Sequence, residues 1–317
     1  MLTKPVPKEL YIEAGLDRTS VSQACKLEIP STDLHRLEVQ ANVRAQITAA
    51  LPQWASCAEA VLAKLASPPH FCVLQGLPWI DLPPDTYHAT LAALMTLVGE
   101  VSDDNSYDAN SGLLAEDVRP TNPASRDVTF RFECEVHSDE SSKPHPEDIV
   151  ALWSVRPAKV GGASLIWDMA DIIATLRSQK NGPRHESILR SRRYPFGGKL
   201  RQPPRVLLAT ILFGNAGVRF RLGAIEDAFD VLGDRPDLEE KAALSALVST
   251  IDRTPPYRFM LSKGQAVFAM NRMTLHSRET FSDAGRWLIK VRANNPQLSN
   301  SKEDLLVGWH DASLSTT

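Results

Sequence analysis

The chain has 317 residues, of which 43% are hydrophobic and 23% are charged, and its net charge is −3. This composition is typical of a globular protein and gives no overall charge for binding nucleic acid or a membrane surface. The first 16 residues lack the apolar segment of a signal peptide, and no apolar run of about 18 residues occurs. The four cysteines form no Cys-x-x-Cys motif, so we expect a cytoplasmic protein with free thiols. The charge and the missing apolar run lead us to expect neither nucleic acid nor a membrane as a partner.

Helices are expected to dominate the first hundred residues. Apolar residues recur at helical spacing from Leu37 onward, and prolines interrupt or open the segments. The pattern predicts helices over residues 37–51, 53–66 and 83–98, and short strands over 26–29 and 71–74. Residues 101–128 are rich in Asp, Asn, Ser and Pro, which is typical of a long surface loop; a short strand is expected within it, at 110–114.

Short strands dominate the remainder of the sequence. They are predicted over residues 128–136, 148–155, 163–167, 206–213, 218–222, 257–261, 265–270 and 287–293, with helices at 169–177 and 237–248. Strands separated by turns favour a sandwich or barrel, with the first helices packed outside it. We expect one domain over residues 1–317, with a barrel core at 128–295, a basic lid insert at about 177–205 and a loosely held polar tail after residue 295.

A His-x-Asp triplet, His137 and Asp139, is the first candidate site. Residues two apart in a strand point to the same face, so both side chains can reach one ion. His276 is the candidate third ligand, and two histidines with one carboxylate form the facial triad of non-haem Fe(II) oxygenases. Alone, the triplet also fits a solvated loop histidine. His145 is a competing ligand, whereas Cys134 is more simply a buried thiol.

Three stretches of sequence in a fixed order resemble one family. They are residues 111–120 (SGLLAEDVRP), residues 137–168 with Gly161-Gly162-Ala163-Ser164, and residues 271–288. The last two resemble the taurine dioxygenase-like (TauD/TfdA) family of Fe(II)/2-oxoglutarate-dependent oxygenases, and the first looks more like its clavaminate synthase and amino-acid hydroxylase branch. The resemblance covers about residues 70–295. It implies a mainly β fold with flanking helices, the double-stranded β-helix or jelly-roll barrel.

The resemblance also implies roles for single residues. It assigns the iron ligands as His137, Asp139 and His276. Arg286 would bind the distal carboxylate of 2-oxoglutarate, since a guanidinium meets a carboxylate with two parallel hydrogen bonds. Ser164 would add a hydroxyl donor. Lys290 stands where members often carry a second arginine, and it is counted with the cosubstrate-binding residues.

The implied activity is hydroxylation or desaturation of a small molecule, with 2-oxoglutarate and O₂ converted to succinate and CO₂. An amino acid or an amino-acid-derived natural-product intermediate is the expected substrate class. Because related halogenases replace the carboxylate ligand with a small residue, Asp139 disfavours halogenation. Two alternatives stay open: a cupin-type metal enzyme that does not use 2-oxoglutarate, and a catalytically silent jelly roll that binds a small molecule.

Residues in loops recognise the substrate in such folds, and the sequence gives one indication of the charge of the substrate. Arg219 and Arg221 stand roughly where the arginine hydroxylases of this branch carry acidic residues. We therefore expect a substrate that is not a cationic amino acid and that can carry an extra anionic group. The alternative is that these arginines, with the basic residues between 190 and 205, only solvate a surface loop. The sequence does not predict the oligomeric state.

Overall fold

The structure of the chain is a computed structural model. It describes residues 2–17, 19–20, 37–77, 84–102, 115–120, 134–197, 205–298 and 308–311. The strands expected at 26–29 and 110–114 and the first part of the strand expected at 128–136 lie outside the described residues. In the described part of the chain, no helix is long and apolar enough to cross a membrane.

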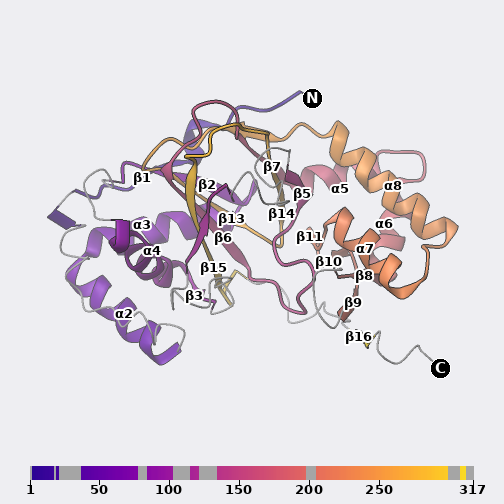
Figure 1. Cartoon of the computed structure of the whole chain (residues 1–317), viewed down its shortest axis with the longest axis horizontal. Helices are drawn as coiled ribbons and strands as arrows, with labels where there is room; N and C mark the ends of the chain where they lie inside the picture. Colours follow the sequence, from indigo (N-terminus) through magenta and orange to yellow (C-terminus); the bar gives the residue numbers. More distant parts are fainter. Residues whose placement is uncertain are drawn as a thin grey trace.

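Two layers of helices enclose two β-sheets (Figure 1). At one end lie α2 (Leu37–Ala50), α3 (Pro52–Leu65) and α4 (Pro84–Val98), at the positions the sequence predicts. Pro52 is tolerated in the first turn of α3, where its missing N–H group has no helical partner to lose. These helices cover the outer face of the larger sheet through an apolar cluster centred on Ile47, Trp54 and Phe268.

The larger sheet has the strand order β1-β2-β13-β6-β15-β3, and β4 also pairs with β15. Its strands are β1 (Tyr11–Glu13, after the 3₁₀ turn η1, Lys8–Leu10), β2 (Phe71–Gln75), β3 (Glu100–Val101), β4 (Glu116–Val118), β6 (Ile149–Arg156), β13 (Ala266–Met270) and β15 (Trp287–Asn294). Alternate residues point to opposite faces. In β13, Ala266 and Phe268 therefore pack under the helices, whereas Val267 and Ala269 face the inside of the fold.

The smaller sheet has the order β12-β7-β14-β5 and contributes Ile166 and Phe259 to the apolar cluster that also holds Val267. Its strands are β5 (Cys134–His137), β7 (Ser164–Asp168), β12 (Tyr257–Phe259) and β14 (Thr274–Arg278). Two sheets that bury a shared interior, with helices outside, confirm the jelly-roll expectation.

The second helical layer covers the outer face of the smaller sheet. It consists of α5 (Met169–Arg177), α6 (Gly182–Ser191), α7 (Leu222–Leu232) and α8 (Leu238–Arg253), with the short strands β8 (Tyr194–Phe196), β9 (Arg205–Ala209), β10 (Leu212–Phe213), β11 (Gly217–Val218) and β16 (Gly308–Asp311). Side-chain caps begin two of the helices. Asp168 accepts from the backbone of Ala170 at the start of α5, and Asp237 forms a capping box with Glu240 at the start of α8.

Three sequence expectations in this region are wrong. Residues 182–196, expected within a lid, form α6 and β8, because Ile188 and Leu189 are buried and Arg190 is paired with Glu186 on the same helix. Residues 218–222 are mostly not a strand, since α7 begins at Leu222. The tail is not wholly loose, because β16 pairs antiparallel with β9. Residues 198–204 of the expected lid lie outside the described residues.

Candidate metal centre and cosubstrate pocket

The three proposed metal ligands come together on the inner face of the smaller sheet. His137 is the last residue of β5, and the antiparallel register with β14 places His276 directly opposite it. Asp139 follows two residues later, in the turn that leaves β5. In the described part of the chain, these are the residues whose donor atoms meet as a possible metal site, all within 4.8 Å of one another.

The donor atoms are arranged to surround one ion. Oδ1 of Asp139 lies 3.3 Å from Nε2 of His137 and 3.5 Å from Nε2 of His276. Donors about 2.1 Å from an ion and at right angles to each other lie about 3 Å apart, so these separations need little adjustment. The two imidazole rings have centroids 4.4 Å apart and are tilted by 56°. The set fits one face of an octahedral metal centre.

The surroundings of His137 direct its Nε2 lone pair to the metal position. Nδ1 of His137 lies 2.8 Å from the carbonyl oxygen of Glu135, which favours the proton on Nδ1. Burial by itself would lower the pKa of His137, but the hydrogen bond to Asp139 raises that pKa to about 9, so a metal ion that binds at Nε2 must displace a proton. The pKa of His276 is lowered by burial and by the neighbouring His137, so His276 stays neutral and able to bind a metal.

Asp139 is fixed through both its backbone and its side chain. Asn271 accepts a hydrogen bond from the backbone N–H of Asp139 at 2.7 Å. Oδ2, the oxygen turned away from the histidines, lies 3.3 Å from Nε of Arg292 and 3.4 Å from Nζ of Lys290. Burial opposes ionisation of Asp139, but these two cations and the histidines hold its pKa well below the usual range. Asp139 is therefore an anionic ligand at neutral pH.

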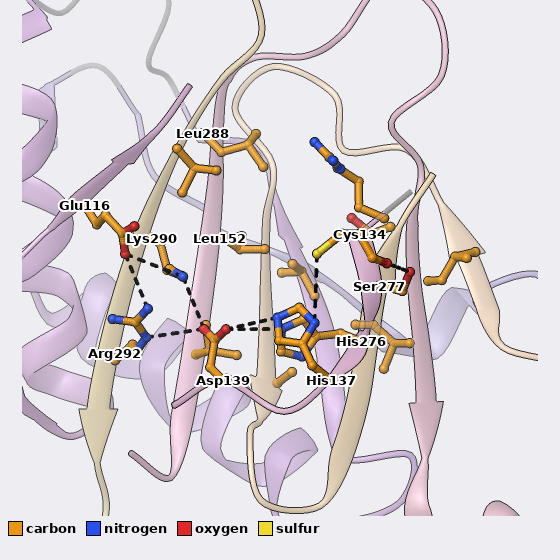
Figure 2. A pocket seen from close by; sticks show the side chains of 18 of the residues that line it. Glu116, Cys134, His137, Asp139, Leu152, His276, Ser277, Leu288, Lys290 and Arg292 are labelled. Carbon is orange, nitrogen blue, oxygen red and sulfur yellow. Dashed lines mark hydrogen bonds and ion pairs between the residues drawn. The ribbon is translucent and has the colours of Figure 1, made fainter. Parts of the chain in front are cut away.

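The triad opens into a cavity of about 550 Å³, large enough for a cosubstrate and a small substrate. Figure 2 shows Asp139 between the two histidines on one side and Lys290 and Arg292 on the other. Apolar residues from both sheets form part of the walls of the cavity. They include Val150, Leu152, Ile166, Val267, Ala269 and Leu288.

Arg286 and Ser164 line the same cavity. Arg286 is only 7% exposed, and burial lowers its pKa to about 10, with a contribution from Arg278. Its guanidinium lies 4.9 Å from the Phe281 ring centre, and no carboxylate of the described residues pairs with it. A buried cation without an anionic partner is costly, so this end of the cavity suits a carboxylate ligand. Ser164 lies opposite Arg278 in the β7–β14 ladder.

The two candidate substrate residues separate in space. Arg221 lines the cavity, where its Nε lies 2.6 Å from Oε1 of Glu135. Arg219, by contrast, is 1% exposed and donates to the backbone carbonyls of Ser141, Lys143 and Pro144. The interpretation of Arg219 as a substrate contact is therefore wrong. It is a structural residue that fixes the turn after Asp139.

The remaining candidates from the sequence are Lys290, His145 and Cys134. Lys290 lines the cavity but lies beside Asp139 and Glu116, 3.5 Å from Oε2 of the latter. His145 is exposed and is not part of the ligand cluster. The Cys134 sulfur lies 3.9 Å from Nδ1 of His137, on the ring nitrogen that does not face Asp139.

Sequence reasoning missed four residues of the site: Glu116, Asn271, Arg278 and Arg292. Two of them could have been found from their spacing in the sequence. Arg278 lies two residues after His276, and Arg292 lies two residues after Lys290. Residues two apart in a strand lie on the same face, so each arginine shares a face with a candidate residue. Glu116 reaches the site through the pairing of β4 with β15, for which the sequence offers no local sign.

Comparison with known proteins agrees with this geometry. The family model described as "Taurine catabolism dioxygenase TauD, TfdA family" matches residues 34–292. No curated protein sequence matches the chain significantly.

Solved structures with the same fold include two oxygenases. An asparagine oxygenase in complex with Fe(II), 2S,3S-3-hydroxyasparagine and succinate has a TM-score of 0.64 at 18% identity, over 90% of this chain and 93% of that one. The non-heme iron oxygenase OrfP with Fe, succinate and (3S)-hydroxy-L-Arg has a TM-score of 0.60 at 18% identity, over 96% and 100%. OrfP with Fe and alpha-ketoglutaric acid has a TM-score of 0.58 at 15% identity, over 90% and 94%. At these identities the similarity establishes the fold.

A jelly roll with a His–Asp–His cluster at the base of its cavity defines the class of non-haem iron oxygenases. The chain belongs to the taurine catabolism dioxygenase TauD/TfdA family and is an Fe(II)/2-oxoglutarate-dependent oxygenase.

Proposed function

We propose that His137, Asp139 and His276 hold Fe(II), and that Arg286 and Ser164 bind the distal carboxylate of 2-oxoglutarate. The observation that carries this assignment is that one cavity holds both the His–Asp–His cluster and a buried arginine that no carboxylate of the described residues pairs with. When bound, iron, 2-oxoglutarate and O₂ supply the oxidising chemistry, and succinate and CO₂ are the co-products. The protein contributes position, charge and exclusion of bulk water.

The residues around the triad support oxygenation over the two alternatives. A cupin-type enzyme without 2-oxoglutarate has no use for the desolvated Arg286. A silent binding protein has no use for three converging metal donors, of which Asp139 is held anionic and His276 neutral. The carboxylate of Asp139 occupies the position that a halide would need, so we propose hydroxylation or desaturation.

We propose an amino acid, or a natural-product intermediate derived from one, as the substrate. Support comes from the fold shared with an asparagine oxygenase and with OrfP, whose structures hold a hydroxylated asparagine and a hydroxylated arginine. Because Arg219 is excluded as a substrate contact, the expected preference for the charge of the substrate depends on Arg221. The guanidinium of Arg221 is already paired with Glu135. An acidic or neutral side chain should therefore bind better than a basic one, which would meet Arg221 at the cavity wall.

The deciding assay is substrate-dependent formation of succinate, run over a panel of acidic, neutral and basic amino acids. Asp139→Ala and His276→Ala should abolish it, and the exposed His145→Ala is the matched histidine control. Succinate formation that survives either triad substitution would refute the ligand assignment. Faster turnover of basic amino acids than of acidic ones would refute the charge preference.

The extent of the domain and its location are also proposals. One oxygenase domain over residues 1–317 is supported by the sharing of β6, β13 and β15 between the outer helices and the cavity. The expected limit of the barrel core, 128–295, is too narrow, because β1, β2, β3 and β4 belong to the larger sheet. A cytoplasmic location is supported by the free thiols of Cys57, Cys72 and Cys134.

A further inference from the structure

Arg292 is the most buried cation at the metal centre. It lies in β15 and is 2% exposed. Because Leu288, Lys290 and Arg292 alternate along the strand, all three face the cavity. Figure 2 shows Arg292 on the side of Asp139 that faces away from both histidines.

Arg292 contacts three carboxylates at once. Its Nε donates to Oδ2 of Asp139 at 3.3 Å, and its Nη2 lies 3.3 Å from Oε2 of Glu116 and 3.4 Å from Oε1 of Glu140. Lys290 shares the first two of these partners. The planar guanidinium suits this task, since its donors diverge in a rigid fork.

The two oxygens of Asp139 consequently have different surroundings. Oδ1 faces the two histidine nitrogens, whereas Oδ2 faces Arg292 and Lys290. A carboxylate can bind a cation through one oxygen or through both. If Oδ2 were released, a small rotation of the side chain would bring both oxygens to the ion. A fourth coordination position would then be filled by protein, although this chemistry needs three open ones.

We propose that Arg292 is a positioning residue that keeps Asp139 a one-oxygen ligand and keeps Glu116 and Glu140 paired to itself. The coordination positions needed by 2-oxoglutarate and O₂ thereby stay open. This inference rests on the proposed function, because it assumes that Asp139 is a metal ligand. In this role, Arg292 raises the affinity for the cosubstrate without contacting the cosubstrate.

The test uses Co(II) as a spectroscopic probe, with the wild type and Arg292→Gln compared. Co(II) is titrated first, followed by visible absorption, and 2-oxoglutarate is then titrated into the Co(II) protein. Removal of a positive charge near the triad and release of Oδ2 of Asp139 should both strengthen binding of the metal ion. Arg292→Gln should therefore bind Co(II) at least as tightly as the wild type. Its absorption should already differ before 2-oxoglutarate is added, and its affinity for 2-oxoglutarate should fall about tenfold, within the range typical of residues that hold metal ligands.

Two further variants keep the outcome interpretable. Arg258→Gln removes another ion-paired arginine, the partner of Glu279 on the surface, and should leave both titrations unchanged. Arg292→Lys keeps the positive charge but loses the diverging donors of the guanidinium. It should lower the affinity for 2-oxoglutarate by a smaller factor than Arg292→Gln does. If Arg292→Gln does not fold, Arg292→Lys tests the role of Arg292 in its place. Weaker Co(II) binding, or unchanged binding of both ligands, in a folded variant overturns the role of Arg292. A wild type that binds neither ligand refutes the proposed function instead.

Discussion

Asn271 holds the backbone of Asp139 from both sides. Its Oδ1 accepts from the N–H of Asp139 at 2.7 Å, and its Nδ2 donates to the carbonyl oxygen of Asp139 at 3.1 Å and to that of Glu147 at 2.9 Å. Asn271 directly follows β13, so the loop that carries the metal-binding carboxylate is tied to a strand 132 residues away in sequence. Both residues are buried, with Asn271 1% and Asp139 7% exposed.

Asn271→Ala should therefore loosen the metal centre. We expect a loss of metal affinity of roughly 10- to 100-fold, because Asp139 no longer has a fixed backbone, together with a lower melting temperature. Isothermal titration with Mn(II) and thermal unfolding measure the two effects. Asn294→Ala, an exposed asparagine at the end of β15, is the control. Unchanged Mn(II) affinity in Asn271→Ala would show that the backbone contacts do not position Asp139.

Arg286→Gln should act on the cosubstrate and not on the metal. A buried cation that pairs with a carboxylate contributes at least ~2 kcal/mol, which corresponds to a rise of about 30-fold in the KM for 2-oxoglutarate. Metal affinity should stay near that of the wild type, since no metal ligand contacts Arg286. Steady-state succinate formation at varied 2-oxoglutarate concentration measures the change. An unchanged KM would place the distal carboxylate elsewhere in the cavity.

Arg219 and Arg221 should respond differently to removal of charge. Arg219→Met leaves three backbone carbonyl groups, one buried and two part-buried, without their donor, and we expect a loss of about 3 kcal/mol in the free energy of unfolding. Arg221→Gln should change that free energy by less than about 1 kcal/mol, since its ion pair is half-exposed, while it changes the relative KM values of acidic and basic substrates. Urea denaturation and the substrate panel separate the two roles. A stable Arg219→Met variant would contradict the structural role.

Glu186 links α6 to α5 and should make stability depend on acid pH. Hydrogen bonding to Arg177 and then to Arg190 lowers the pKa of Glu186 from its ordinary value of 4.5. Its stabilising effect is therefore fully present above pH 4.5 and is lost as the pH falls through the lower folded-state value. Glu186→Gln should melt about 2 °C below the wild type at pH 7, and the difference should shrink below pH 4.5. The exposed Glu59→Gln is the control. A difference that grows toward acid pH would contradict this origin.

Local chemistry made much of the fold predictable. Pro52 and Pro84 open helices, and Asp168 and Asp237 cap them, because caps and prolines act on backbone groups within a few residues. Helix α6 escaped prediction because its two buried apolar residues, Ile188 and Leu189, are adjacent and make no helical stripe. Its stability depends on neighbours that pack against it, such as α8.

By itself, the sequence determined the chemical types at the site: two histidines, one carboxylate two residues after the first, and an arginine ten residues after the second. Strand geometry predicted that the side chains of His137 and Asp139 point to the same side, although Asp139 lies in the turn that follows β5. The tertiary structure decided which charges act there. It buried Arg219 against a turn, turned Arg221 to Glu135, and placed Arg292 on Asp139. The reason is physical: residue spacing fixes the direction of a side chain relative to its own strand, but only the register between distant strands fixes what that side chain meets.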